Sequence, residues 1–131
     1  MRVILDTNIL VSALITPSGV AERIYRAWRA GRFELLTCSE QLSEFRRVTR
    51  YPRVRSYVRP AEAGTLLNEL RRLTDLIENL PRVDAVSDPS DRFLLGLALA
   101  GRADYLVTGD RSHLFWRCAA MVERKLSPPV T

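Results

Sequence analysis

Short apolar runs and longer helical repeats alternate along this chain of 131 residues, and they predict an alternation of strands and helices. The runs that predict strands are residues 2–5, 34–37, 75–78 and 104–107. Helical spacing is found at residues 8–15, 20–30 and 92–100, with two more helices starting near Ser39 and at Pro60. Strands that alternate with helices are typical of a parallel sheet covered on both faces. We therefore expect one α/β domain over residues 1–131.

Turn and capping residues mark several predicted helix ends. Gly31 is placed to end the helix of residues 20–30, and Tyr51-Pro52 to end the helix that starts near Ser39. The hydroxyl of Thr37 or of Ser39 is available to cap the start of that helix. The helix from Pro60 has an apolar stripe, predicted to face the core, of Leu66, Leu67, Leu70 and Leu73.

The segment Asp88-Pro89-Ser90-Asp91 predicts a helix start, with an aspartate at the N-cap, a proline at N1 and an acid at N3. The helix that follows, residues 92–100, is apolar nearly all round, and we expect it to be deeply buried. Gly101 ends it.

Carboxylates stand where two predicted strands end. Val3-Ile4-Leu5 runs into Asp6, and Tyr105-Leu106-Val107 runs through Thr108 and Gly109 into Asp110. If these strands are parallel neighbours, both acids lie at one edge of the sheet, where open parallel sheets bind ligands. Asp91 begins the helix before the second strand, and Glu44 lies about 40° from Val48 on its helix, facing inward.

Four converging carboxylates repel one another, and a divalent cation removes the conflict. An all-carboxylate site selects hard ions such as Mg²⁺ or Mn²⁺, which favour phosphodiester hydrolysis by metal-activated water. Each acid also has a structural interpretation. Asp6, Asp110 and Asp88 are possible N-caps, Asp91 is a favourable first-turn acid, and Glu44 is placed to pair with Arg47.

The net charge is +5, and the 20 basic residues include a single lysine, Lys125. Arginine suits phosphate, but an excess spread along the chain is weak evidence for nucleic acid. Cys38 and Cys118 show no metal-ligand spacing, and His113 is the only histidine. No stretch has the length or hydropathy of a membrane span, and Asp6 interrupts the first apolar run, so we expect a cytoplasmic protein.

The stretches VILDTNILVSAL, SEQLSEF and DPSDRFLLGLALAGRADYLVTGD, in this order, resemble the PIN-domain family over about residues 1–112. Within it they resemble the VapC-like toxins of toxin–antitoxin pairs. The resemblance implies a three-layer α/β/α sandwich around a parallel sheet, and Mg²⁺- or Mn²⁺-dependent cleavage of single-stranded RNA. It also implies a homodimer and a cognate antitoxin, for which residues 20–31 and 62–73 are candidate surfaces.

The resemblance also assigns roles by position. Asp6, Glu44 and Asp91 match the metal-binding acids, and Asp110 matches the acid that binds a second metal or positions water. The polar positions around them, for substrate or supporting contacts, are Thr7, Asn8, Thr108 and Asp88.

The tail, residues 113–131, departs from the family pattern, because it lacks the glycine turn and a clear last strand. Residues 119–123 are a candidate replacement edge strand.

The leading hypothesis, from the four acids and the resemblance, is a metal-dependent endoribonuclease toxin. A catalytically impaired module that binds RNA or protein is the first alternative, and a nuclease for DNA flaps or RNA processing is the second.

Overall fold

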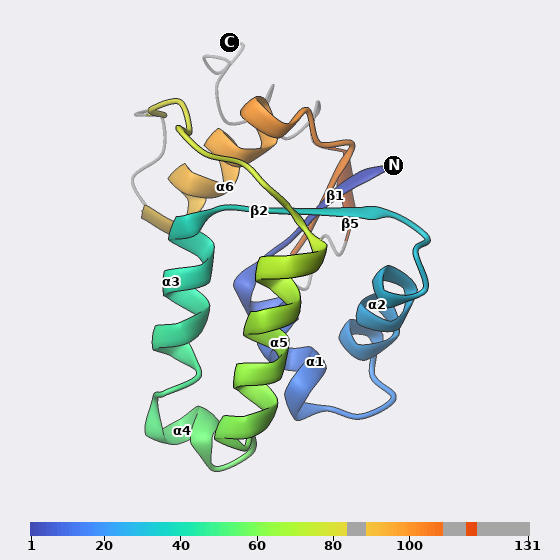
Figure 1. Cartoon of the computed structure of the whole chain (residues 1–131), viewed down its shortest axis with the longest axis vertical. Coiled ribbons are helices and arrows are strands. Elements are labelled where there is room, and N and C mark those ends of the chain that lie inside the picture. Colours follow the sequence, from blue (N-terminus) through green and yellow to red (C-terminus); the bar gives the residue numbers. More distant parts are fainter. Residues whose placement is uncertain (84–88, 109–114, 118–131) are drawn as a thin grey trace, which may run out of the picture.

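The computed structural model describes residues 1–83, 89–108 and 115–117, and for residues 89–91 and 115–117 it describes the backbone alone. A five-stranded sheet has the order β3-β2-β1-β4-β5. Its strands are β1 (Arg2–Leu5), β2 (Glu34–Thr37), β3 (Asp75–Leu76), β4 (Tyr105–Val107) and β5 (Phe115–Arg117). The neighbouring strands β3 and β2, β2 and β1, and β1 and β4 pair in parallel, and β5 pairs antiparallel with β4 (Figure 1).

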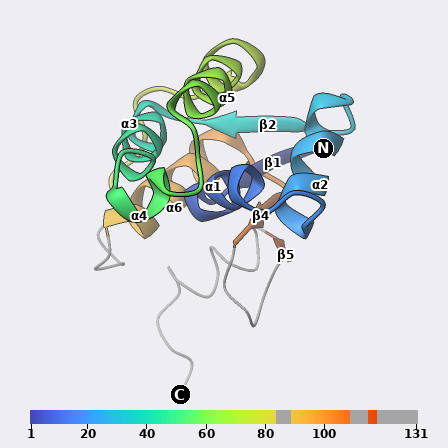
Figure 2. The same ribbon diagram turned by 90° about the horizontal axis from the view of Figure 1, so that it is seen from below.

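The helices are α1 (Thr7–Ile15), α2 (Val20–Arg29), α3 (Ser39–Val48), α4 (Pro52–Arg55), α5 (Pro60–Leu73) and α6 (Pro89–Gly101). In Figure 1, α1, α2, α3 and α5 lie below the strands and α6 lies above them, so that seen from below α6 lies behind the strands (Figure 2). No helix of the described residues is long and apolar enough to cross a membrane.

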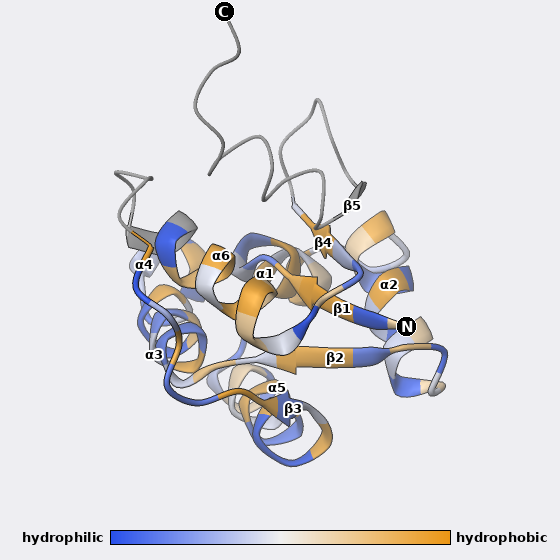
Figure 3. Cartoon of the chain, turned by 90° about the horizontal axis from the view of Figure 1, so that it is seen from above, coloured by the Kyte–Doolittle hydropathy of each residue, from blue (hydrophilic) through white to orange (hydrophobic). Residues whose placement is uncertain are grey.

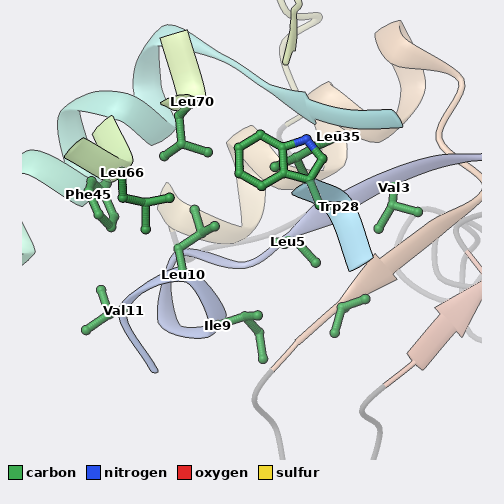
Figure 4. Close-up of a cluster of buried hydrophobic side chains, with 11 residues drawn as sticks. Val3, Leu5, Ile9, Leu10, Val11, Trp28, Leu35, Phe45, Leu66 and Leu70 are labelled. Carbon is green, nitrogen blue, oxygen red and sulfur yellow. The ribbon is translucent and has the colours of Figure 1, made fainter. Parts of the chain in front are cut away.

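Two apolar clusters fill the spaces between these layers, because successive strand residues point to opposite faces. Val3 and Leu5 pack with Trp28, Phe45 and side chains of α1 and α5 (Figure 4). Ile4 packs on the other face, in a cluster with Leu36, Leu106 and four residues of α6. The expected α/β/α sandwich around a parallel sheet is confirmed.

Several predicted boundaries are confirmed. Gly31, at φ 77°, follows the last turn of α2, where its N–H donates to Trp28 O and the N–H of Arg32 to Ala27 O. This pair of hydrogen bonds is the Schellman arrangement that a glycine permits. α6 begins at Pro89 and ends at Gly101, as predicted, and its face of Leu94, Leu95, Leu97 and Ala98 is buried.

Other predictions are wrong or untested. The start of α3 has no side-chain cap, because the Thr37 hydroxyl donates to Gln41 instead. α3 ends at Val48, before Tyr51-Pro52, and Leu73 of the predicted stripe is 47% exposed, at the end of α5. β3 stops at Leu76, two residues early. Asp88, Asp110 and residues 119–123 lie outside the described residues, and β5 was not predicted.

Candidate active site at the ends of β1 and β4

β1 and β4 end side by side. Leu5 stands opposite Val107 in the parallel register, and the N–H of Asp6 donates to Val107 O at 2.9 Å. The two strands are therefore the parallel neighbours that the sequence argument required. Asp6 and Thr108, the residues that follow them, meet at the carboxyl edge of the sheet.

The Asp6 carboxylate is held from two sides. Its Oδ1 accepts from the N–H of Asn8 at 3.0 Å, which caps α1, and its Oδ2 accepts from the Thr108 hydroxyl at 3.2 Å. The capping role considered for Asp6 is confirmed. The hydrogen bonds from Asn8 and Thr108 fix the orientation of the group, and a carboxylate oxygen can accept more than one such bond.

Thr7 differs from its neighbours in the DTN motif. It is only 1% exposed, and its hydroxyl has no hydrogen-bond partner among the described residues. Asn8, in contrast, is exposed. A buried hydroxyl without a partner costs about 1–3 kcal/mol. Thr7, the first residue of α1, thus faces away from solvent, whereas Asn8 is accessible to a ligand.

Glu44 lies half-buried in the wall of a cavity of about 530 Å³. α3 supplies Glu40, Ser43, Glu44 and Arg47 to this wall, and α6 supplies Arg92 and Phe93. The opposite wall is residues 80–83. Asp91 directly precedes Arg92 in α6, so its backbone is one residue from the lining. Asp6 is not among the described residues that line this cavity.

Gln41 is the site residue that the sequence argument missed. It is 1% exposed, its Nε2 donates to Leu5 O at 2.6 Å, and its Oε1 accepts from the Thr37 hydroxyl at 2.6 Å. These bonds attach α3 to the ends of β1 and β2, one turn before Glu44. A signal was present in the sequence, because Gln41 precedes the buried Phe45 by four residues and so shares its face of the helix.

The donor chemistry fits a hard cation, since Asp6 and Glu44 offer oxygen ligands alone. No group of three His, Cys, Asp or Glu side chains gathers as a metal site in the part of the chain that the structure describes. The side chains of Asp91 and Asp110, which would complete the predicted set, fall outside that part. Asp6 and Glu44 each supply the kind of oxygen ligand that Mg²⁺ or Mn²⁺ prefers, and their joining with Asp91 and Asp110 in one ligand set stays a prediction.

A comparison with models of protein families matches the chain to the PIN domain over residues 2–112. The chain belongs to the PIN domain family. PIN domains are in general nucleases, and they typically use divalent metals. Membership of the family therefore indicates a nuclease-type hydrolase that binds nucleic acid. The match spans all four predicted acids and ends before residue 113. Curated proteins gave no match.

Proposed function

We propose that this PIN domain is an endoribonuclease that cleaves single-stranded RNA with Mg²⁺ or Mn²⁺. The observation that carries the proposal is the junction of β1 and β4, where the Asp6 carboxylate is fixed by Asn8 and Thr108 at 3.0 and 3.2 Å. A carboxylate fixed at the carboxyl edge of a parallel sheet is placed where such folds bind their ligands.

In this proposal Asp6, Glu44 and Asp91 hold the cation, and Asp110 binds a second cation or orients water. A bound cation neutralises phosphate charge and lowers the pKa of a bound water, which supplies the nucleophile. The protein contributes orientation. Thr108 and the Asn8 N–H fix Asp6, and Gln41 fixes the helix that carries Glu44 relative to the strand that carries Asp6.

The test compares cleavage of a labelled single-stranded RNA by wild type, Asp6→Asn and Glu44→Gln in Mn²⁺ or Mg²⁺. Asparagine still caps a helix well, so Asp6→Asn removes charge and keeps the fold. We expect both variants to lose at least about 100-fold in initial rate, since they remove proposed metal ligands. EDTA should abolish cleavage by the wild type.

Glu40→Gln is the matched control, because Glu40 lies on the same helix and lines the same cavity but is not a proposed ligand. Its rate should stay within about twofold of wild type. Wild-type cleavage that survives EDTA, or full activity in both ligand variants, contradicts the mechanism. Saturable RNA binding with neither cleavage nor Mn²⁺ binding by calorimetry identifies the impaired binding module instead. Cleavage of DNA flaps in preference to RNA identifies the other nuclease class.

We further propose that the nuclease is the toxin of a toxin–antitoxin pair in the cytoplasm, acting as a homodimer. The support is the resemblance of its motifs to the VapC-like branch. Induced expression should arrest bacterial growth, and Asp6→Asn should relieve the arrest. Co-expression of the product of a short overlapping reading frame upstream should also relieve it. Growth that is unaffected by a soluble, active protein contradicts the toxin role.

A further inference from the structure

Four arginines line a second cavity, of about 450 Å³, on the side of α3 that faces α4 and α5. Arg46 lies on α3, Arg50 follows the end of α3, Arg55 lies on α4 and Arg71 on α5. Its apolar part includes Phe45, which is fully buried, and Ala63. We name it the arginine pocket. It shares no lining residue with the cavity that contains Glu44.

Acidic side chains are absent from the described lining of the arginine pocket. Glu40 and Glu44 of α3 face the other cavity. On α5, Glu62 is 3.9 Å from Arg59, and Glu69 pairs with Arg29 at 2.6 Å. Within the described residues, none of the four pocket arginines makes a salt bridge. The described acids of α3 and α5 therefore lie away from the arginine pocket, whereas Arg47 of α3 shares the other cavity with Glu40 and Glu44.

Four guanidinium groups around one apolar-floored cavity repel one another, and an anion that enters it offsets this repulsion. The planar guanidinium donates two parallel hydrogen bonds to a phosphate, and several such groups around one cavity suit a phosphodiester. The cavity is of the size that holds small ligands, about 300–1,000 Å³. The chemistry thus indicates a phosphate group as the occupant.

The position of the pocket favours a phosphate on a polynucleotide. Arg46 follows Glu44 by two residues on α3, about 3 Å further along the helix axis, and Arg50 comes just after the end of α3. A strand cleaved beside Glu44 has further phosphates within a few such distances. We propose that the arginine pocket binds a backbone phosphate of the nucleic acid strand, outside the carboxylate site. This inference rests on the proposed nuclease function, whereas the pocket itself needs no metal.

The test measures binding of a labelled single-stranded RNA by fluorescence anisotropy in EDTA, where no metal-dependent cleavage occurs. Arg55→Gln/Arg71→Gln should weaken binding about tenfold and reduce the slope of log K against log salt by about 1.4, or 0.7 per lost contact. Arg53→Gln/Arg72→Gln is the matched control, since these exposed arginines lie on α4 and α5 but do not line the pocket. It should bind within about twofold of wild type.

Gly64 allows a second test that keeps every arginine. It lines the pocket, and a Cβ added there meets nothing within 4 Å. Gly64→Glu should place a carboxylate among the arginines and weaken RNA binding at least as much as the double variant. Gly64→Gln adds the same bulk without charge and should bind more tightly than Gly64→Glu. Circular dichroism and thermal melts verify folding of every variant.

The outcomes separate this inference from the nuclease proposal. Equal binding by the pocket pair and the control pair overturns the arginine pocket, even if the wild type cleaves RNA. Loss of binding in the pocket pair alone supports the pocket, even if no cleavage is found. In a competition experiment, polyglutamate and unlabelled RNA of equal charge are compared for their ability to displace labelled RNA from the wild type. If polyglutamate is equally effective, the proposal that a polynucleotide occupies the pocket is overturned, and an acidic protein segment is identified as the occupant.

Discussion

Burial sets the chemistry of Cys38, which follows β2 and is fully enclosed in the cluster beneath α6. Desolvation raises the pKa of its thiol from 9.0 to about 11. Since the thiolate is the reactive form, we expect iodoacetamide at about pH 8.5 to leave Cys38 unmodified in the native protein and to alkylate it in urea. Peptide mapping separates it from Cys118. Equal labelling rates in both states contradict the prediction.

The same shift has a consequence for stability. The thiol of the unfolded chain ionises near 9.0, whereas the buried thiol keeps its proton up to about 11. The unfolded chain therefore binds fewer protons than the native protein between these values, and the free energy of unfolding falls as pH rises through this window. Cys38→Ala removes this contribution and should flatten that part of the pH profile, measured by urea unfolding.

Single-residue roles were predictable where the neighbours on the chain determine them. Asp6 caps the helix that begins at the next residue, so its place could be inferred from DTN alone. Gln41 accepts a hydrogen bond from the Thr37 hydroxyl and donates one to Leu5 O, which is 36 residues away from it. Such a bond depends on how α3 packs against the sheet, and the local pattern instead suggested a hydroxyl cap.

At the scale of elements, two helices contain a glycine with opposite surroundings. A Cβ at Gly96 of α6 would lie 2.9 Å from the backbone oxygen of Pro81, whereas one at Gly64 of α5 meets nothing within 4 Å. We expect Gly96→Ala to destabilise the protein by about 1–3 kcal/mol, because a backbone segment must move. Gly64→Ala should stabilise it by about 0.5–1 kcal/mol through helix propensity.

Urea unfolding of the two variants measures both signs. Pro81 also lines the cavity that contains Glu44, so Gly96→Ala should lower nuclease activity as well, whereas Gly64→Ala should leave that cavity unchanged. Equal and small effects of the two substitutions would show that residues 80–81 do not press on α6.

Strand and helix positions were predictable from apolar periodicity, but their partners were not. β1, β2, β4 and α6 appear close to their predicted bounds because each is a short apolar run or an apolar helix that begins at a proline and ends at a glycine. Leu73 fits the repeat of α5 but is exposed, and the two-residue β3 ends before its apolar run does. A period shows which residues share a face and does not show where the neighbouring element stops.

At the scale of the whole molecule, Arg2 links several elements at the amino ends of the strands, on the edge of the sheet opposite the candidate site. Its guanidinium donates to Gly101 O at 2.7 Å, to Glu34 at 2.8 Å and to Asp75 at 2.9 Å. Polar residues begin β1 and β2 before the apolar runs, as the hydropathy colours show (Figure 3). One side chain thus joins β1, β2, β3 and the end of α6.

We expect Arg2→Gln to lower the free energy of unfolding by about 1–2 kcal/mol, because three hydrogen bonds are lost from a partly exposed side chain that water screens. Arg32→Gln, which removes an exposed arginine nearby with no salt bridge among the described residues, should cost less than about 0.5 kcal/mol. Urea titrations at neutral pH compare them. Equal effects would show that the Arg2 contacts add nothing beyond charge.

The arrangement of charge over the molecule could not be predicted from the sequence. A net charge of +5 shows an excess of arginine and not where it gathers. Arg46, Arg55 and Arg71 come together only because α4 turns the chain so that α5 runs beside α3. The meeting of the two strand ends at one edge of the sheet could likewise not be predicted outright, because it required β1 and β4 to be parallel neighbours.

The central place of β1 also affects how the protein is made. Thr108, which bonds to Asp6, follows it by 102 residues, and β4 pairs with β1 across almost the same separation. At about 5–20 residues per second, a ribosome adds these residues over roughly 5–20 s. During that time one edge of β1 has no strand beside it, and the Asp6 carboxylate has no threonine to orient it. The nascent chain therefore gains its carboxylate site only after Thr108 has been added.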